Sequence, residues 1–160
     1  MVYCKTYLEE FVENLYTTLS IQNPSQLDYQ IIAKQLGIRV KDTFGSSTCL
    51  QGGSVSYILL NNKLSKESKW QEFAHELCHL LRHAGNQLTV PEPFLEMQEW
   101  QANSFALHFC IPTFMLEKLD LSAYKQVTIA EIAQTFGVEY DFAEERLERW
   151  LLQRAIVYYG

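Results

Sequence analysis

The chain has 160 residues, 48% of them hydrophobic, and a net charge of −6 from 13 basic and 19 acidic side chains. This length predicts a core that needs no disulfides, in one domain with at most a small appendage. No Lys/Arg-rich block is present, which argues against DNA or RNA as the main partner. Neither a signal peptide nor an apolar run of about 18 residues is found. The four cysteines form no C-x-x-C pair, so we expect a cytoplasmic protein with reduced thiols and no membrane contact.

Apolar periodicity predicts the elements of the first half of the chain. Residues 8–19 carry apolar side chains at three- and four-residue steps, which is typical of an amphipathic helix. A second, shorter helix is predicted over residues 27–36. Strands are predicted at Ile38–Val40 and Val55–Asn61, and the intervening Gly-, Ser- and Thr-rich segment, residues 42–54, is predicted to be a loop.

The second half is predicted to be helical. A helix is expected over residues 65–83, with Ser65 as its N-cap, and its apolar side chains cover more than one face. Such a helix should be buried, so ionisable groups inside it require a reason. Further helices are predicted over residues 94–110, 127–137 and 141–157.

Three residues of the helix 65–83 form the motif H-E-x-x-H, at His75, Glu76 and His79. Residues i and i+4 lie one turn apart on one helix face, so both imidazoles can reach one metal ion. Glu76 then lies beside the ion, where it can hold and deprotonate a water molecule. Zinc suits such ligands and lowers the pKa of a bound water to about 7. The alternative, two exposed histidines on an ordinary helix, fits poorly with so apolar a helix.

A third metal ligand is expected from the helix 94–110, where three glutamates are available. We favour Glu99, because Asn103 follows one turn later and could hold the outer nitrogen of a ligating histidine. Glu96 is better explained as a solvated carboxylate on the helix face. Glu92 is better explained as a residue at the helix entry.

Two motifs together resemble those of the ImmA/IrrE family of metallopeptidases. The first is H-E-x-x-H-L-L-x-H, which begins at His75, and the second is E-x-Q-A-N-x-F-A, which begins at Glu99; Ile111-Pro112 follows. The similarity spans roughly residues 25–115. It implies the zinc ligands His75, His79 and Glu99, with Glu76 as the general base.

The resemblance also implies an α+β fold, in which a small sheet packs on the H-E-x-x-H helix of a thermolysin-like minimal metallopeptidase core. Residues 1–118 are predicted to be this peptidase domain, and residues 119–160 a helical extension similar to a helix-turn-helix. The recognition helix of a DNA-binding helix-turn-helix carries basic or amide side chains, whereas the corresponding helix of this extension is acidic. We therefore expect no direct nucleic-acid binding. The acidic residues are Glu139, Asp141, Glu144 and Glu145.

The sequence does not identify the residue that would stabilise the oxyanion formed in the reaction. Candidates are His83, His108 and Tyr57, and a structural role is the simpler explanation for both histidines. The edge of the strand Val55–Asn61 is expected to bind an extended substrate as an added strand, by analogy with thermolysin-like enzymes.

These features predict a zinc-dependent endopeptidase that hydrolyses a peptide bond in a protein. The family resemblance implies that the substrate is a helix-turn-helix transcriptional repressor, so the enzyme would be an anti-repressor of a phage or mobile element. The alternative is a catalytically inactive metal-binding module that binds a repressor or another protein. The presence of every metal and base residue favours the enzyme. Manganese or cobalt could occupy a similar site.

Overall fold

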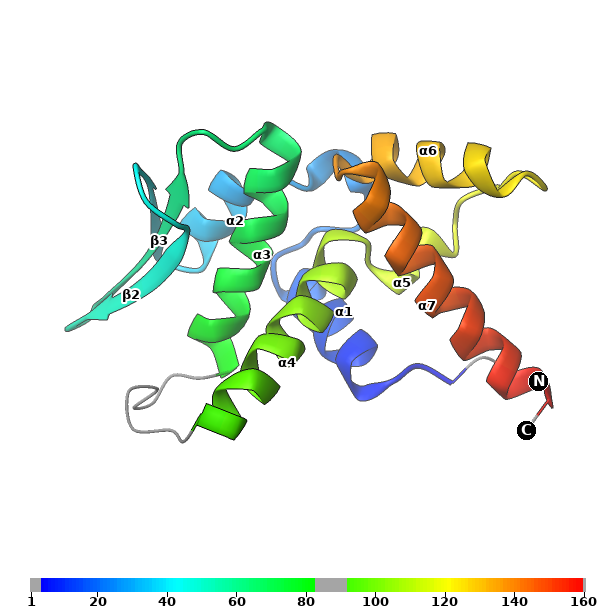
Figure 1. Cartoon of the computed structure of the whole chain (residues 1–160), viewed down its shortest axis with the longest axis horizontal. Coiled ribbons are helices and arrows are strands. Elements are labelled where there is room, and N and C mark those ends of the chain that lie inside the picture. The colour runs from blue at the N-terminus through cyan, green and yellow to red at the C-terminus, as the bar shows by residue number, and fades with distance from the viewer. Residues whose placement is uncertain (1–3, 83–91, 160) are drawn as a thin grey trace. The chain divides into compact units, whose positions relative to one another are not determined.

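The computed structural model describes residues 4–82 and 92–159 (Figure 1). Helices and one small mixed sheet form an α+β fold, as predicted. The chain divides into two compact units, of which one is residues 28–106 and the other combines residues 1–27 with 107–160. The division into a peptidase domain and an extension after residue 118 stays a prediction.

The helices expected from apolar periodicity are present, with their ends shifted by a few residues. The predicted N-cap at Ser65 is confirmed, because its Oγ accepts a hydrogen bond of 3.0 Å from the backbone N–H of Ser68. In chain order the elements are α1 (Tyr7–Thr18), η1 (Pro24–Gln26), α2 (Tyr29–Gln35), β1 (Ile38–Thr43), β2 (Thr48–Gly52), β3 (Val55–Asn61), α3 (Lys66–Arg82), α4 (Glu92–Cys110), α5 (Thr113–Leu116), α6 (Lys125–Phe136) and α7 (Tyr140–Tyr159).

The sheet has the strand order β1-β3-β2. β1 runs parallel to β3, whereas β2 runs antiparallel to it, with Cys49 opposite Ile58. Helix α3 packs on both β3 and β2. The structure therefore confirms a small sheet packed on the helix that carries H-E-x-x-H.

The loop predicted over residues 42–54 is wrong, because this segment contains the strand β2 and the end of β1. β2 is an edge strand with mostly exposed side chains, so it lacks the alternating apolar pattern that marks a half-buried strand. One local signal was present. Gly53, at φ 61°, and Ser54 form a two-residue hairpin connection between β2 and β3, and Gly-Ser is a recognised sequence for such a turn.

The strand order also corrects the predicted place of a free edge. β3 is the middle strand and has a partner on each side, so it cannot accept a further strand. Within the described sheet, β2 is the edge strand that packs beside α3.

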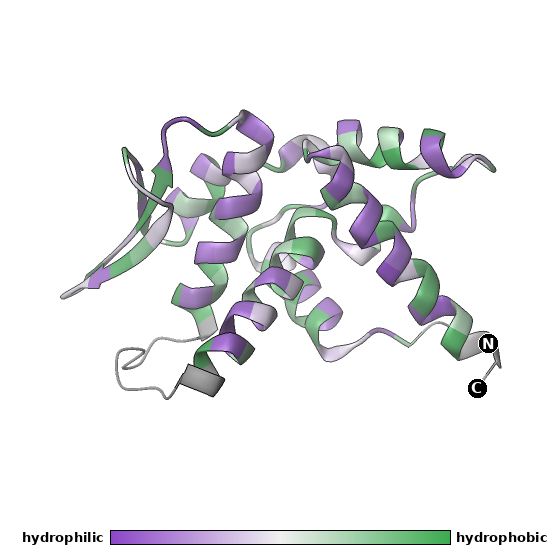
Figure 2. Cartoon of the chain, viewed as in Figure 1, coloured by the Kyte–Doolittle hydropathy of each residue, from purple (hydrophilic) through white to green (hydrophobic). Residues whose placement is uncertain are grey.

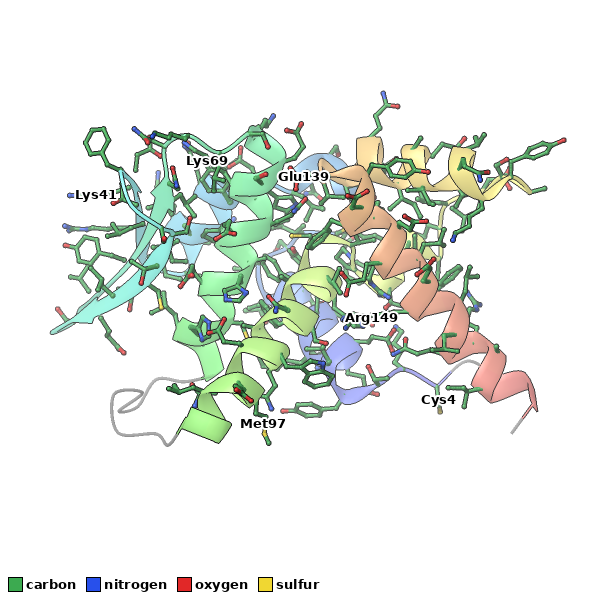
Figure 3. The ribbon with its side chains drawn as sticks, viewed as in Figure 1. Cys4, Lys41, Lys69, Met97, Glu139 and Arg149 are labelled. Carbon is green, nitrogen blue, oxygen red and sulfur yellow. The ribbon has the colours of Figure 1, made fainter. Side chains whose placement is uncertain are left out.

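The two faces of the sheet differ in character. Ile58 and Leu60 of β3 are fully buried on the face toward α3. Tyr57 alternates with them and therefore points to the outer face, where the Lys41 Nζ lies 5.8 Å from its ring centroid. Figure 3 shows Lys41 on the side of the strands away from α3.

The second unit is built mainly from α1, α5, α6 and α7. The Tyr16 hydroxyl donates a 2.7 Å hydrogen bond to the carbonyl of Phe109, 93 residues away in the sequence. Gly137, at φ 64°, ends α6 in the left-handed conformation that favours glycine. Figure 2 shows polar and apolar residues mixed along α7. Among the described helices, none combines the length and the apolar character that a membrane crossing requires.

Candidate metal centre

Helix α3 places the two histidines of the motif on one face. His75 and His79 are separated by one turn, and their ring centroids lie 4.9 Å apart. The side chain of His75 is 19% exposed and that of His79 is 9% exposed, so both rings lie at the edge of the buried region. The apolar residues around them in α3, including Phe73 and Leu77, are fully buried and anchor the helix.

Glu99 of α4 meets both histidines. Its Oε2 lies 3.1 Å from Nε2 of His75, and its Oε1 lies 3.0 Å from Nε2 of His79. The two Nε2 atoms are themselves 3.1 Å apart. Ligands of a tetrahedral zinc ion at its usual bond lengths are about 3.3 Å from each other. The donor set and its spacing therefore fit a metal ion such as zinc.

Asn103, one turn beyond Glu99 on α4, contacts the outer nitrogen of His75. Its Oδ1 lies 2.9 Å from Nδ1 of His75. An amide oxygen accepts only, so Nδ1 carries the proton and donates it, which leaves Nε2 with a free lone pair on the side of Glu99. The structure thus brings Asn103 to the place that its spacing predicted.

Glu76 lies beside this group and is only 8% exposed. Burial is the main cause that raises the pKa of its carboxyl group above the usual value, and the neighbouring His75 acts in the opposite direction. Burial, followed by the negative charge of Glu76, raises the pKa of Cys49 of β2 to about 12. A buried carboxylate with a raised pKa is suited to accept a proton during a reaction.

The structure does not bring every candidate to this group. Tyr57 lies on the outer face of the sheet, where its hydroxyl accepts a weak 3.5 Å contact from Arg39. Glu96 is exposed on α4 and is not among the residues that gather around His75. His108 is buried further along α4. His83 and the side chain of Glu92 lie outside the described residues, so these two predictions are not addressed.

The family model described as the IrrE N-terminal-like domain, a peptidase family, matches residues 26–148. The chain belongs to the ImmA/IrrE family. The match includes His75, His79, Glu99 and Asn103, and it extends well into the segment that we expected to be a C-terminal extension.

Two relatives from Bacillus subtilis strain 168 are similar over nearly the whole chain. The phage-like element PBSX protein XkdA is 44% identical over 151 residues, which cover 94% of this chain and 76% of the relative. The uncharacterised protein YqaB is 37% identical over 147 residues, which cover 92% of this chain and 86% of the relative. This ImmA/IrrE chain is therefore a homologue of a protein of a phage-like element.

A Mycobacterium tuberculosis transcriptional regulator of known structure has a similar fold. The TM-score is 0.59 at 17% sequence identity, and the match covers 85% of this chain. The chain spans 44% of the length of that regulator. At this identity the similarity concerns the fold alone.

Sequence reasoning missed that the strand β2, which carries Cys49, lies beside α3. The segment around Cys49 was expected to be a loop, so no face could be assigned to its side chain. Recognising the Gly53-Ser54 turn would have placed Cys49 on a strand paired with β3.

Proposed function

We propose that this ImmA/IrrE protein is a zinc-dependent endopeptidase. The observation that supports it best is the convergence of His75, His79 and Glu99, whose ligand atoms all lie within 4.8 Å of one another, beside the buried Glu76. Two imidazoles, one carboxylate and an adjacent carboxylate base form a donor set known in zinc peptidases. We also propose that the peptidase domain expected over residues 1–118 is a thermolysin-like minimal core, in which the unit of residues 28–106 contains the metal centre.

Different residues have different roles in the proposed reaction. His75, His79 and Glu99 would hold zinc, which supplies a Lewis acid that polarises the scissile carbonyl and makes water more acidic. Glu76 accepts a proton from the attacking water and then delivers it to the nitrogen of the leaving amine. Asn103 keeps His75 in the tautomer that binds metal.

The substrate is proposed to bind in an extended conformation along β2. This edge strand packs beside α3, which carries the H-E-x-x-H motif, and an added strand would gain backbone hydrogen bonds there. A cleaved peptide in which single residues are replaced by proline tests this step. We expect loss of cleavage at alternate positions, where the peptide N–H pairs with β2. Equal cleavage of all proline variants would contradict binding by strand addition.

The proposed substrate is a helix-turn-helix transcriptional repressor in the cytoplasm. Two observations support an anti-repressor role: the resemblance to the ImmA/IrrE family and the similarity to XkdA, a protein of a phage-like element. Cleavage of such a repressor would release the genes of a prophage or mobile element.

The experiment incubates the zinc-loaded protein with the repressor encoded beside its gene and with a pool of internally quenched peptides. We expect cleavage by the wild type and none by Glu76→Gln, which keeps the ligands. If repressor binding persists without cleavage of repressor or peptides under inducing conditions, the inactive binding module replaces the enzyme. Removal of zinc with a chelator should abolish cleavage, and added zinc should restore it.

A further inference from the structure

The charged residues of the described strands are separated between the two faces of the sheet. They are Arg39, Lys41 and Asp42, and all belong to β1. Asp42 lies on the inner face, the face toward α3, where its Oδ1 is 2.8 Å from Nζ of Lys69 of that helix. Arg39 and Lys41 lie on the outer face, because successive side chains of a strand alternate between the faces. The outer face is therefore positive on a chain whose net charge is −6.

The two cations lie beside accessible apolar surface. Arg39 of β1 and Leu50 of β2 are both paired with Tyr57 of β3, so these three side chains form a row across the outer face. In the next row Lys41 is paired with Leu59. Leu50 is 52% exposed, and Tyr57 and Leu59 are half-buried. The outer face thus combines positive charge with apolar side chains that are open to solvent.

Both cations approach the ring of Tyr57. The guanidinium carbon of Arg39 lies 5.9 Å from the ring centroid, and Nζ of Lys41 lies 5.8 Å from it. Within the part of the chain that the structure describes, neither cation forms a salt bridge with a carboxylate, whereas Lys69 on the inner side does. Two like charges beside one ring repel each other, and a negatively charged group of a partner would stabilise both.

These features fit an acidic protein segment better than other partners. Tyrosine and arginine often contribute most to binding between proteins, and here apolar side chains surround them. Nucleic acids are bound through many phosphates, and this face offers two cations on an acidic chain. A second copy that used the same face would bring like charges together. The face also includes Leu50 of β2, the edge strand along which the substrate is proposed to bind.

We propose that the outer face of the sheet is a second binding surface for the protein substrate, which docks an acidic segment that also carries apolar side chains. This inference rests on the proposed peptidase function. The carboxylates of the segment would lie at Arg39 and Lys41, and its apolar side chains would cover Leu50 and Leu59. A substrate held along β2 would meet this face at a high effective concentration, which a short peptide does not exploit.

The binding test uses the labelled repressor encoded beside the gene and the zinc-loaded Glu76→Gln protein, which should bind without cleaving. Adding Lys41→Glu should weaken binding roughly tenfold at low salt, because it places like charges opposite each other, and less at high salt. Lys118→Glu is the matched control: Lys118 is an exposed lysine 5.7 Å from the ring centroid of Phe114, and its reversal changes the net charge equally. This control should stay within about twofold of the parent protein. Equal affinities of the two variants, or no binding of the repressor, overturn the inference.

The kinetic test uses the active enzyme. Lys41→Glu should raise KM for the repressor roughly tenfold, with kcat, zinc content and cleavage of the short quenched peptides unchanged. An equal loss on repressor and peptides overturns a separate docking surface. If the wild type cleaves nothing but Lys41→Glu still weakens repressor binding, the peptidase function is contradicted and the docking surface stands.

Cross-linking identifies what lies on this face. A carbodiimide joins an amine to a carboxylate in direct contact, so Lys41 should be linked to an Asp or Glu of the repressor. A link from Lys41 to a carboxylate of a second copy of the chain would overturn the inference in favour of self-association. Binding of a labelled single-stranded DNA that Lys41→Glu abolishes and Lys118→Glu does not would overturn it in favour of nucleic acid.

Discussion

The two ring nitrogens of His75 have different partners, and this difference determines which of them can bind metal. Nδ1 donates to Asn103, and Nε2 faces Glu99 and His79. We expect Asn103→Ala to weaken zinc affinity roughly 10- to 100-fold, as is typical for loss of a partner of a ligating histidine. Competition with a zinc-selective chelator measures this. Asn103→Asp keeps an acceptor oxygen and should bind zinc more tightly than Asn103→Ala; equal affinities would contradict the role of the acceptor.

The buried carboxyl group of Glu76 lowers the free energy of unfolding of the metal-free protein at neutral pH. Burial raises the pKa of Glu76, so the folded state disfavours its charged form and loses stability as the pH rises through that pKa. Glu76→Gln should therefore raise the Tm of the metal-free protein at pH 7. The gain should vanish below about pH 4, where the carboxyl is protonated in both states. A gain that is the same at pH 4 and pH 7 would contradict this explanation.

The metal-binding residues could be predicted because their signal is local. One helical turn separates His75 from His79 and Glu99 from Asn103, and both helices were evident from apolar periodicity. The positions of the Tyr57 and Cys49 side chains depend on strand register and strand order, which cannot be read from a single sequence. A loop over residues 42–54 assigns no face to Cys49, and without β2 the sequence does not show which face of the sheet Tyr57 occupies.

At the scale of elements, a buried network joins α7 to α1 and α5. Arg146 of α7 is fully buried, and its guanidinium donates to the Thr113 hydroxyl at 2.7 Å and to the Ile111 carbonyl at 3.1 Å. The same Thr113 hydroxyl donates to Glu9 of α1 at 2.7 Å, and the Glu9 carboxylate lies 4.0 Å from the guanidinium. Three segments far apart in the sequence are thereby held by one charge pair and its hydrogen bonds.

This network predicts a large difference between two arginines of α7. Arg146→Ala removes one partner of a buried pair and should lower the free energy of unfolding by about 3–5 kcal/mol. Arg149 pairs with Glu145 at the surface at 2.7 Å, so Arg149→Ala should cost about 0.3–0.5 kcal/mol. Urea unfolding of both variants measures these values. Similar costs for the two arginines would contradict the structural role of the network.

At the scale of the whole molecule, the two compact units should respond differently to metal. The donors of the candidate centre all belong to the unit of residues 28–106. Zinc at a hundred times its dissociation constant should slow hydrogen exchange of the protected amides of α3 roughly hundredfold, or about 2.7 kcal/mol, and leave those of α6 and α7 unchanged. Mass spectrometry of exchanged peptides measures this. Equal slowing of hydrogen exchange in both units would contradict independent unfolding of the two units.

The sequence alone could not predict which helices and strands belong to each unit. Periodicity predicted α1 and α7 as separate helices, yet it contains no information on which distant elements pack together. Residues 1–27 belong to the same unit as residues 107–160, and contacts such as that of Tyr16 with Phe109 are formed across most of the chain. The family match to residue 148 likewise extends past the expected boundary at residue 118.

The most direct test is the zinc content of the purified protein by elemental analysis, in the wild type and in three variants. We expect one zinc per chain in the wild type and in Glu76→Gln, and reduced or no zinc in His79→Ala and Glu99→Gln. Full occupancy in Glu99→Gln would contradict Glu99 as the third ligand. A wild type that binds no zinc when zinc is supplied would contradict the metallopeptidase account as a whole.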